Sequence, residues 1–209
     1  MKADLVVVGG GAAGMICAGT AAQAGRSVIL LEPNDKLGRK LRITGKGRCN
    51  CTNNCGVREF MASVPTNPKF LYSCLNAFPP EDTMAFFESI GVPLKTERGS
   101  RVFPVSDSAN ELADALGGWM RAQGVRVVKT RARDIRTENG AVSGVRTDGG
   151  EIACRAAALC TGGRSYPLTG SRGDGYVLAE RLGHRVIEAR PSLVPLESPD
   201  GFCAELAGF

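Results

Sequence analysis

Apolar and polar positions along this 209-residue chain follow two different periods. Residues 4–8 form a short, continuous apolar run, which is typical of a strand buried on both faces. Small residues from 12 to 24 predict a helix that ends at Gly25. A second apolar run spans 27–31 and stops at Glu32. This order predicts a strand, a helix and a parallel strand, the repeating unit of α/β folds.

The next hundred residues predict mainly helices. Residues 33–67 are expected to be irregular, apart from a short helix near 36–42. Helices are predicted over 68–77 and 81–90, because a helical pattern there is interrupted by Pro79 and Pro80. An extended segment is expected at 101–105. Ser106 and Asp107 are candidate caps for a helix that continues to about Gln123.

The pattern changes to strands after residue 124. Strands are predicted at 125–129, 133–137, 141–147 and 151–154, and two turn sequences, Asn139-Gly140 and Asp148-Gly149-Gly150, separate the last three as hairpins. A buried strand at 156–160 and a helix at 174–182 follow. We therefore predict an α/β fold: a Rossmann-like domain with an inserted antiparallel β-meander.

The turn after the first strand has the glycine spacing of a dinucleotide-binding site. Gly9, Gly11 and Gly14 fit G-x-G-x-x-G, with Ala12 and Ala13 between the last two. In this motif the first glycine permits a tight turn, the second lets a diphosphate approach the backbone, and the third lets the helix pack closely on the strand. Glu32, eighteen residues beyond Gly14, is placed to accept hydrogen bonds from an adenosine ribose. A carboxylate at this position disfavours a 2′-phosphate, and therefore NADP, in this pocket.

The fingerprint does not separate FAD from NAD, but the rest of the chain favours FAD. The meander and a late strand that ends in Thr161-Gly162-Gly163 resemble the FAD domain of flavoproteins of the glutathione-reductase type. Glycines at 162 and 163 would again allow a close approach of the cofactor to the backbone.

The charge distribution and the cysteine content indicate which kinds of partner and which compartment to expect. The net charge is +5, and residues 26–48 alone hold seven basic residues against two acidic ones. Such a confined excess indicates a bound anion more than a nucleic-acid face, which needs a broad basic patch. No apolar run has the length of a membrane span. With eight cysteines in mainly apolar or irregular contexts, we expect a cytoplasmic protein.

Four blocks of sequence resemble one family closely. They are DLVVVGGGAAGM at 4–15, GRKLRITGKGRCNCTN at 38–53, GSRVFPVSDSANELADAL at 99–116 and CTGGRSYPLTGSRGDGYVLAERLGH at 160–184. They are similar to the bacterial FAD-dependent oxidoreductases of the aminoacetone oxidase family, which includes a reductase of unsaturated bile-acid ketones. The resemblance implies FAD as cofactor, with NAD(P)H and a small organic molecule or enone as further partners.

The resemblance also implies where the flavin lies. In that family the R-C-N-x-T-N element runs along the flavin. The cofactor-binding residues implied in this part of the chain are Lys40, Gly47, Arg48, Cys49, Asn50, Thr52 and Asn53, and those implied later are Thr161, Gly162, Gly163 and Asp174. Asp174 opens a helix and is equally well explained as a helix cap. Ser165 and Tyr166 are candidate proton donors, and His184 has a structural role at a helix end. No catalytic residue can be assigned.

Three cysteines within GKGRCNCTNNCG raise the question of a metal or a disulfide. Structural zinc needs four ligands, usually in paired elements, and no second pair is present. Disulfide-reductase flavoproteins keep two cysteines with four residues between them, whereas one, three or five residues separate Cys49, Cys51 and Cys55 from one another. We therefore predict no metal, and consider Cys51 and Cys55 incidental to a loop that contacts the flavin.

The length of the chain suggests how its domains are organised. We expect a FAD-binding domain over 1–195 that lacks its C-terminal return segment, followed over 196–209 by the truncated start of a substrate domain. The favoured function is that of an FAD-dependent oxidoreductase. A non-catalytic FAD- or nucleotide-binding fragment and an RNA-associated flavoprotein are the alternatives.

Overall fold

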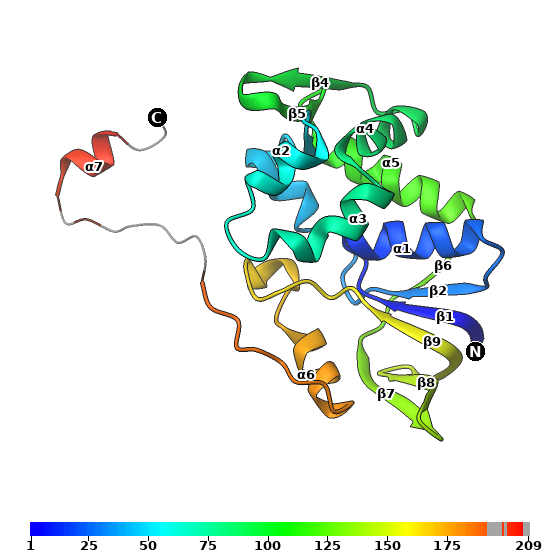
Figure 1. The fold of residues 1–209 in the computed structure, drawn as a ribbon. Helices are drawn as coiled ribbons and strands as arrows, with labels where there is room; N and C mark the ends of the chain where they lie inside the picture. Colours follow the sequence, from blue (N-terminus) through cyan, green and yellow to red (C-terminus); the bar gives the residue numbers. More distant parts are fainter. Residues whose placement is uncertain (192–197, 199, 207–209) are drawn as a thin grey trace.

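The computed structural model describes residues 1–191, 198 and 200–206. Its main feature is a six-stranded sheet with the strand order β6-β2-β1-β9-β8-β7 (Figure 1). These strands are β1 (Lys2–Val8), β2 (Val28–Leu31), β6 (Arg126–Val128), β7 (Ala132–Glu138), β8 (Ala141–Thr147) and β9 (Gly150–Leu159). The strands β6, β2, β1 and β9 run parallel, whereas β7, β8 and β9 form an antiparallel meander. The predicted α/β fold with its meander is confirmed.

Strand β9 is longer than predicted. Two strands were expected at 151–154 and 156–160, but a single strand spans Gly150–Leu159. Its first residues pair with β8, and its later residues pair with β1 up to Val8 and Leu159. Arg155, which separates the two predicted strands, is exposed, and the residues on either side of it, Cys154 and Ala156, both pair with β1. The meander therefore extends the parallel sheet instead of forming a sheet of its own.

Helices cover both faces of the sheet. α1 (Ala12–Gln23) and α5 (Ala109–Ala122) lie on one face, and α6 (Asp174–Arg181) lies on the other (Figure 1). Successive residues of β1 serve the two faces in turn: Val7 packs in a cluster with residues of α1 and α5, and Val6 and Val8 in a second cluster that includes Leu178 of α6. Burial on both faces explains the continuous apolar runs 5–8 in β1 and 28–31 in β2.

The small residues of α1 let a second helix come close. A Cβ atom on Gly19 would lie only 2.2 Å from the ring of Trp119 on α5. Ser108, rather than the predicted Ser106 or Asp107, caps α5, since its Oγ accepts a hydrogen bond from the N–H of Glu111 at 3.3 Å. Both features fix α5 against α1 and the sheet.

A second, three-stranded sheet lies beyond these helices. It has the order β3-β5-β4 and is antiparallel, with β3 (Thr52–Asn53), β5 (Arg101–Pro104) and β4 (Leu94–Glu97). Only β5 was predicted, because β3 is two residues long and has no periodicity of its own. Three helices accompany this sheet: α2 (Val57–Ala62), which was not predicted, α3 (Tyr72–Ala77) and α4 (Pro80–Ser89).

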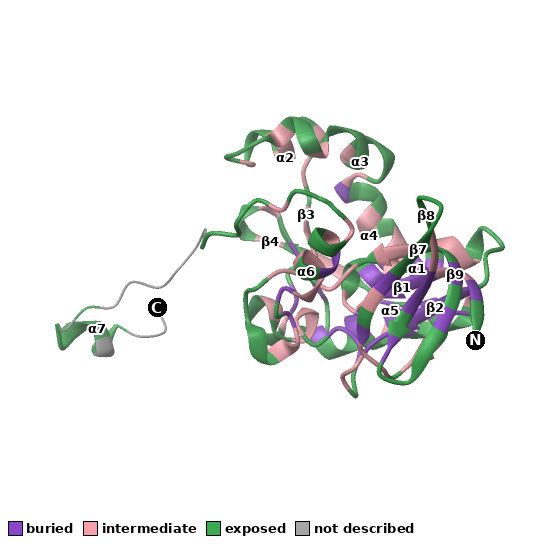
Figure 2. Cartoon of the chain, turned by 90° about the horizontal axis from the view of Figure 1, so that it is seen from below, coloured by how far each residue is buried: buried purple, intermediate pink, exposed green. Residues whose placement is uncertain are grey.

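Burial differs between the two parts. Buried residues concentrate on β1, β2, α1 and α5, whereas α2 and α3 have none (Figure 2). The remaining elements are α7 (Phe202–Glu205) and four short 3₁₀ segments at Leu41–Gly47, Pro68–Leu71, Arg98–Ser100 and Pro167–Thr169. The predicted domain boundary after residue 195 lies outside the described residues. Among the helices that are described, none has the length and apolar character needed to cross a membrane.

Candidate cofactor site

A cavity of about 710 Å³ opens at the carboxyl ends of β1, β2 and β9. This is the edge at which parallel α/β sheets bind their ligands. Its lining consists of the strand ends, the glycine turn, the β6–β7 connection, the segment after β9 and the start of α6: Val8–Ala13, Leu31–Asn34, Arg39–Leu41, Thr44, Thr130–Ala132, Leu159–Gly162, Thr169–Ser171, Asp174–Tyr176, Leu178 and Ala179. Among the residues proposed from sequence, nine line it: Gly9, Gly11, Ala12, Ala13, Glu32, Lys40, Thr161, Gly162 and Asp174.

The three motif glycines have different surroundings. Gly9 has a φ of +109°, and a Cβ atom there would lie 2.4 Å from the carbonyl oxygen of Cys160. Gly14 lies at the helix–strand contact, where a Cβ would come within 1.9 Å of the Gly9 carbonyl oxygen. In contrast, a Cβ on Gly11 would meet nothing within 4 Å, because this residue faces the cavity. The turn thus leaves its backbone open only where a ligand could approach.

Glu32 is buried at the base of the cavity and is held by three protein donors. Its Oε2 accepts the N–H of Gly10 at 2.9 Å, and its Oε1 accepts the backbone N–H of Asn34 at 2.8 Å and the Asn34 side-chain amide at 2.6 Å. The residue is only 8% exposed. An ionised carboxylate has about four lone-pair sites, so one site remains for a ligand hydroxyl.

The segment after β9 forms the opposite wall. Thr161 Oγ1 accepts the N–H of Gly175 at 3.1 Å and so joins the strand end to the first turn of α6. Gly162 has a φ of +72°, and a Cβ there would lie 2.8 Å from the Ser171 hydroxyl. Gly163 does not line the cavity.

Asp174 is the first residue of α6, but the N-cap position belongs to Gly173. The Asp174 carboxylate instead forms an ion pair with Arg131, which comes from the β6–β7 connection. This pair ties α6 to the sheet at the rim of the cavity. Ser165 accepts a hydrogen bond from Lys40 Nζ at 3.2 Å, Tyr166 is 67% exposed, and His184 is exposed beyond the helix.

The R-C-N-x-T-N residues lie elsewhere in the structure. None of Gly47, Arg48, Cys49, Asn50, Thr52 and Asn53 lines the cavity. The Arg48 guanidinium forms ion pairs with Glu97 and Asp107 and lies 4.3 Å from the Phe103 ring centre. Asn53 Nδ2 donates to the Gly99 carbonyl at 3.0 Å. In this structure these side chains hold the small sheet together.

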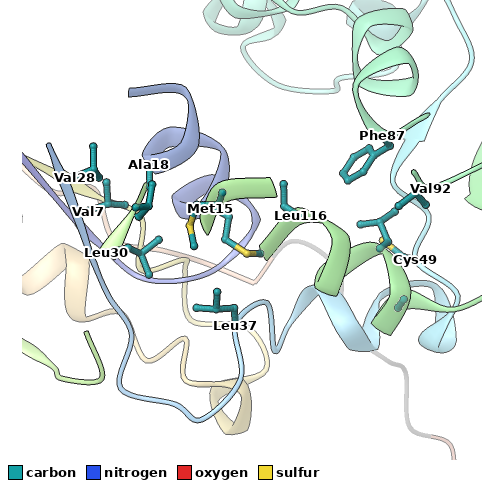
Figure 3. Close-up of a cluster of buried hydrophobic side chains, with 14 residues drawn as sticks. Val7, Met15, Ala18, Val28, Leu30, Leu37, Cys49, Phe87, Val92 and Leu116 are labelled. Atoms are coloured by element: carbon teal, nitrogen blue, oxygen red, sulfur yellow. The ribbon is translucent and has the colours of Figure 1, made fainter. Parts of the chain in front are cut away.

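Two cysteines of this segment, Cys49 and Cys51, pack against other residues of the protein. Cys49 is fully buried in the cluster that also contains Phe87, Val92 and Leu116 (Figure 3). Cys51 Sγ lies 3.5 Å from the Val102 carbonyl, and burial raises the pKa of its thiol to about 11. A protonated thiol is a poor metal ligand and a poor nucleophile. Over the described part of the chain, no three His, Cys, Asp or Glu side chains are grouped for a metal.

Several residues that line the cavity were not predicted from the sequence: Asn34, Arg39, Thr130, Arg131, Ser171 and Tyr176. A partial signal existed for Thr130 and Arg131, because they follow directly on the strand predicted at 125–129. The structure pairs this strand in parallel with β2, and ligands bind at the carboxyl ends of such strands. Ser171 and Tyr176 carried no comparable signal, since a folded loop brings them to the cavity.

Comparison with known proteins gives the family. The family model described as "HI0933-like protein Rossmann domain" matches residues 3–192. The 3-dehydro-bile acid delta(4,6)-reductase of Clostridium scindens is 31% identical over 207 residues, 97% of this chain and 49% of that protein. The ribosomal RNA dihydrouridine synthase of Escherichia coli is 33% identical over 193 residues, 92% of this chain and 47% of that protein. This chain therefore spans about half the length of the curated relatives it matches.

A solved structure supports the fold. The 3-ketosteroid-delta4-(5alpha)-dehydrogenase of Rhodococcus jostii superposes with a TM-score of 0.61 at 20% identity, covering 79% of this chain and 47% of that one. At the level of the family, the predictions of a Rossmann-like FAD-binding fold and of FAD as cofactor are confirmed. The chain, with its glycine turn, the glutamate that follows its second strand and its inserted meander, belongs to the HI0933-like Rossmann family.

Proposed function

We propose that the protein is an FAD-dependent oxidoreductase that reduces a carbon–carbon double bond conjugated with a carbonyl group. The observation that carries this proposal is the cavity at the carboxyl ends of β1 and β2, in which an open glycine turn faces a buried carboxylate. A volume of about 710 Å³ lies within the usual range for cofactor and ligand sites.

The residues present fit the adenosine and diphosphate parts of FAD. The open backbone at Gly11 and Ala12 would approach the diphosphate, and the remaining lone pair of Glu32 would accept a ribose hydroxyl. Thr161, Gly162 and Asp174 would face the flavin side. Bound FAD would supply the hydride chemistry, while the protein positions it and excludes water.

Residues 48–53 would contact the flavin end of the cofactor. They connect to the cavity through Thr44, which lines it and whose carbonyl accepts the N–H of Cys49 at 3.0 Å. In this proposal Arg48 and Asn53 hold the loop in shape, and its backbone makes the contact.

The substrate class rests on what two relatives have in common. One is named for reducing Δ4 and Δ6 double bonds of a 3-oxo bile acid, and the other for making dihydrouridine in ribosomal RNA. In both, the double bond is conjugated with a carbonyl, which makes its far carbon an acceptor for hydride. We propose the same bond type here, with reduced nicotinamide as the source of the hydride.

A nucleobase in RNA is the second candidate substrate, favoured by the likeness to two ribosomal RNA dihydrouridine synthases. The excess of basic residues over 26–48 argues for the small molecule, because it is confined to one short segment, of which Arg39 and Lys40 line the cavity. A third candidate is a protein that binds FAD without catalysing a reaction.

The first experiment is an absorption spectrum of the purified protein supplied with FAD. Bleaching of bound flavin by NADH or NADPH without oxygen, and its return on addition of a steroid dienone, would support the main proposal. Return of the colour with ribosomal RNA alone would favour the second candidate. Bound flavin that neither nicotinamide bleaches would favour the third, and no flavin binding would contradict all three.

A further inference from the structure

Two basic side chains at the cavity are held by neutral partners. Arg39 Nη1 donates to the side-chain oxygen of Asn34 at 2.8 Å, and Lys40 Nζ donates to the Ser165 hydroxyl at 3.2 Å. Within the described ranges, neither lies within 4.0 Å of a carboxylate. The third cation at the cavity, Arg131, is by contrast neutralised by Asp174. Arg39 and Lys40 therefore line the same cavity as the glycine turn without a direct ion pair. Asp35, whose carboxylate senses the charge of Arg39, is itself paired with Lys129.

Asn34 holds Arg39 in one orientation. Because its backbone N–H and its Nδ2 both donate to Glu32 Oε1, at 2.8 and 2.6 Å, its side-chain oxygen must face Arg39. Glu32 is in turn fixed by the N–H of Gly10. A continuous chain of hydrogen bonds thus runs from the glycine turn through Glu32 and Asn34 to Arg39.

The segment after β9 closes over Asn34 and restricts its movement. A Cβ atom on Gly170 would lie 2.7 Å from Asn34 Nδ2, so the backbone of this segment packs directly against the amide. Arg39 keeps four further N–H donors; the residue is exposed and lines the cavity.

We propose that Arg39, with Lys40, neutralises the diphosphate of FAD, and that Asn34 is the positioning residue that orients Arg39 for this contact. The inference rests on the proposed function, because it takes FAD as the ligand. A diphosphate diester carries two negative charges, which match the two cations that have no direct ion pair. A guanidinium also presents its donors in a fork that suits phosphate oxygens. Asn34 serves both ends of the adenosine diphosphate, since it also holds the carboxylate assigned to the ribose.

The test compares the affinities for ADP and for adenosine, which differ by the diphosphate. We expect Arg39→Gln to weaken ADP binding about tenfold to a hundredfold, the size of a lost hydrogen bond to a charged group. Adenosine binding should not change. Arg39→Lys keeps the charge but not the forked donor geometry, so its affinity for ADP should lie between that of the parent and that of Arg39→Gln. The control is Arg26→Gln, an exposed arginine at the other end of β2, which should bind both ligands like the parent.

The positioning role of Asn34 is tested by a double-mutant cycle. Asn34→Ala should raise the ratio of the ADP to the adenosine dissociation constant in the parent, but not in an Arg39→Gln background. Circular dichroism would show that each variant is folded. An unchanged ratio in Arg39→Gln would overturn the role of Arg39, and an equal effect of Asn34→Ala in both backgrounds would overturn that of Asn34. If the parent binds neither FAD nor ADP, the proposed function itself is wrong. If the parent binds both but the variants behave like the parent, only the roles of Arg39 and Asn34 are wrong.

Discussion

Glu32 shows how one side chain combines structure and binding. Its carboxylate accepts N–H groups from Gly10 and Asn34 and lies at the base of the cavity. The residue assigned to a ribose from the sequence thus also ties the glycine turn to the second strand. Loss of the carboxylate should affect both roles.

We predict that Glu32→Ala weakens FAD binding by about 1–3 kcal/mol, the cost of a lost hydrogen bond to a charged group. It should also lower the melting temperature, because the Gly10 N–H and the Asn34 amide lose their acceptor. Calorimetric titration with FAD and thermal unfolding would measure the two effects. Parent-like FAD affinity in the variant would show that the ribose binds elsewhere.

Cys51 and Cys55 provide a second prediction at this scale. The Cys51 thiol, whose pKa burial raises to about 11, stays protonated at neutral pH. The double variant Cys51→Ser, Cys55→Ser should therefore bind FAD like the parent. Elemental analysis should find no stoichiometric metal in either protein. Zinc or iron in the parent that disappears in the variant would refute the interpretation of these cysteines as incidental.

At the scale of the elements, Gly14 allows the start of α1 to pack against the turn that follows β1. We predict that Gly14→Ala destabilises the protein by about 3 kcal/mol or more, because the new methyl group would collide with the Gly9 carbonyl 1.9 Å away. Gly11→Ala is the matched control, since nothing lies within 4 Å of its Cβ. It should leave the melting temperature unchanged but impair FAD binding by narrowing the cavity. Equal stability of the two variants would contradict this account of the turn.

The small sheet depends on a network of charges around Arg48. A hydrogen bond from Arg48 lowers the pKa of Glu97, and hydrogen bonds from Lys95 and Arg48 lower that of Asp107. Groups with lowered pKa values stabilise the folded state above their ordinary values, 4.5 and 3.8 here. This stabilisation is lost as the pH falls through the lowered pKa values.

We therefore predict that part of the stability of the parent is lost below about pH 4.5, and that Arg48→Ala reduces this loss. At neutral pH the variant should unfold at a lower temperature than the parent. Arg101→Ala is the control, since Arg101 also lies over Phe103 but has no carboxylate partner among the described residues. Thermal unfolding of the parent and both variants between pH 3 and pH 7 would test this prediction. An identical pH dependence in Arg48→Ala and the parent would exclude the network as its cause.

At the scale of the whole molecule, the chain spans about half the length of its relatives. Most residues proposed for the adenosine and diphosphate line the cavity, whereas several proposed for the flavin side, Gly163 and residues 47–53, do not. We predict that this chain binds FAD more weakly than a full-length relative such as the Escherichia coli protein. Each missing hydrogen bond would cost roughly 1 kcal/mol. Titration of both proteins under one condition tests this, and equal, tight binding would show that the second half contributes little.

The sequence by itself determined the parts whose signals are local. The apolar runs at 4–8 and 27–31, the three motif glycines and Glu32 lie within about thirty residues. Strand burial, turn geometry and close helix packing impose direct requirements on residue type over such distances. The hairpin turns of the meander were equally predictable, because Asn-Gly and Asp-Gly sequences favour a particular turn conformation of their own backbone.

Only the tertiary structure decided what depends on pairing between distant segments. The continuity of β9 depends on β1 and β8, and the two-residue strand β3 exists only because β5 lies beside it. Likewise, Arg131 reaches the cavity through the parallel pairing of β6 with β2, whereas Arg48 is drawn to Glu97 and Asp107 in the small sheet. These placements are set by the free energy of packing and ion pairing among distant residues, which no local pattern records.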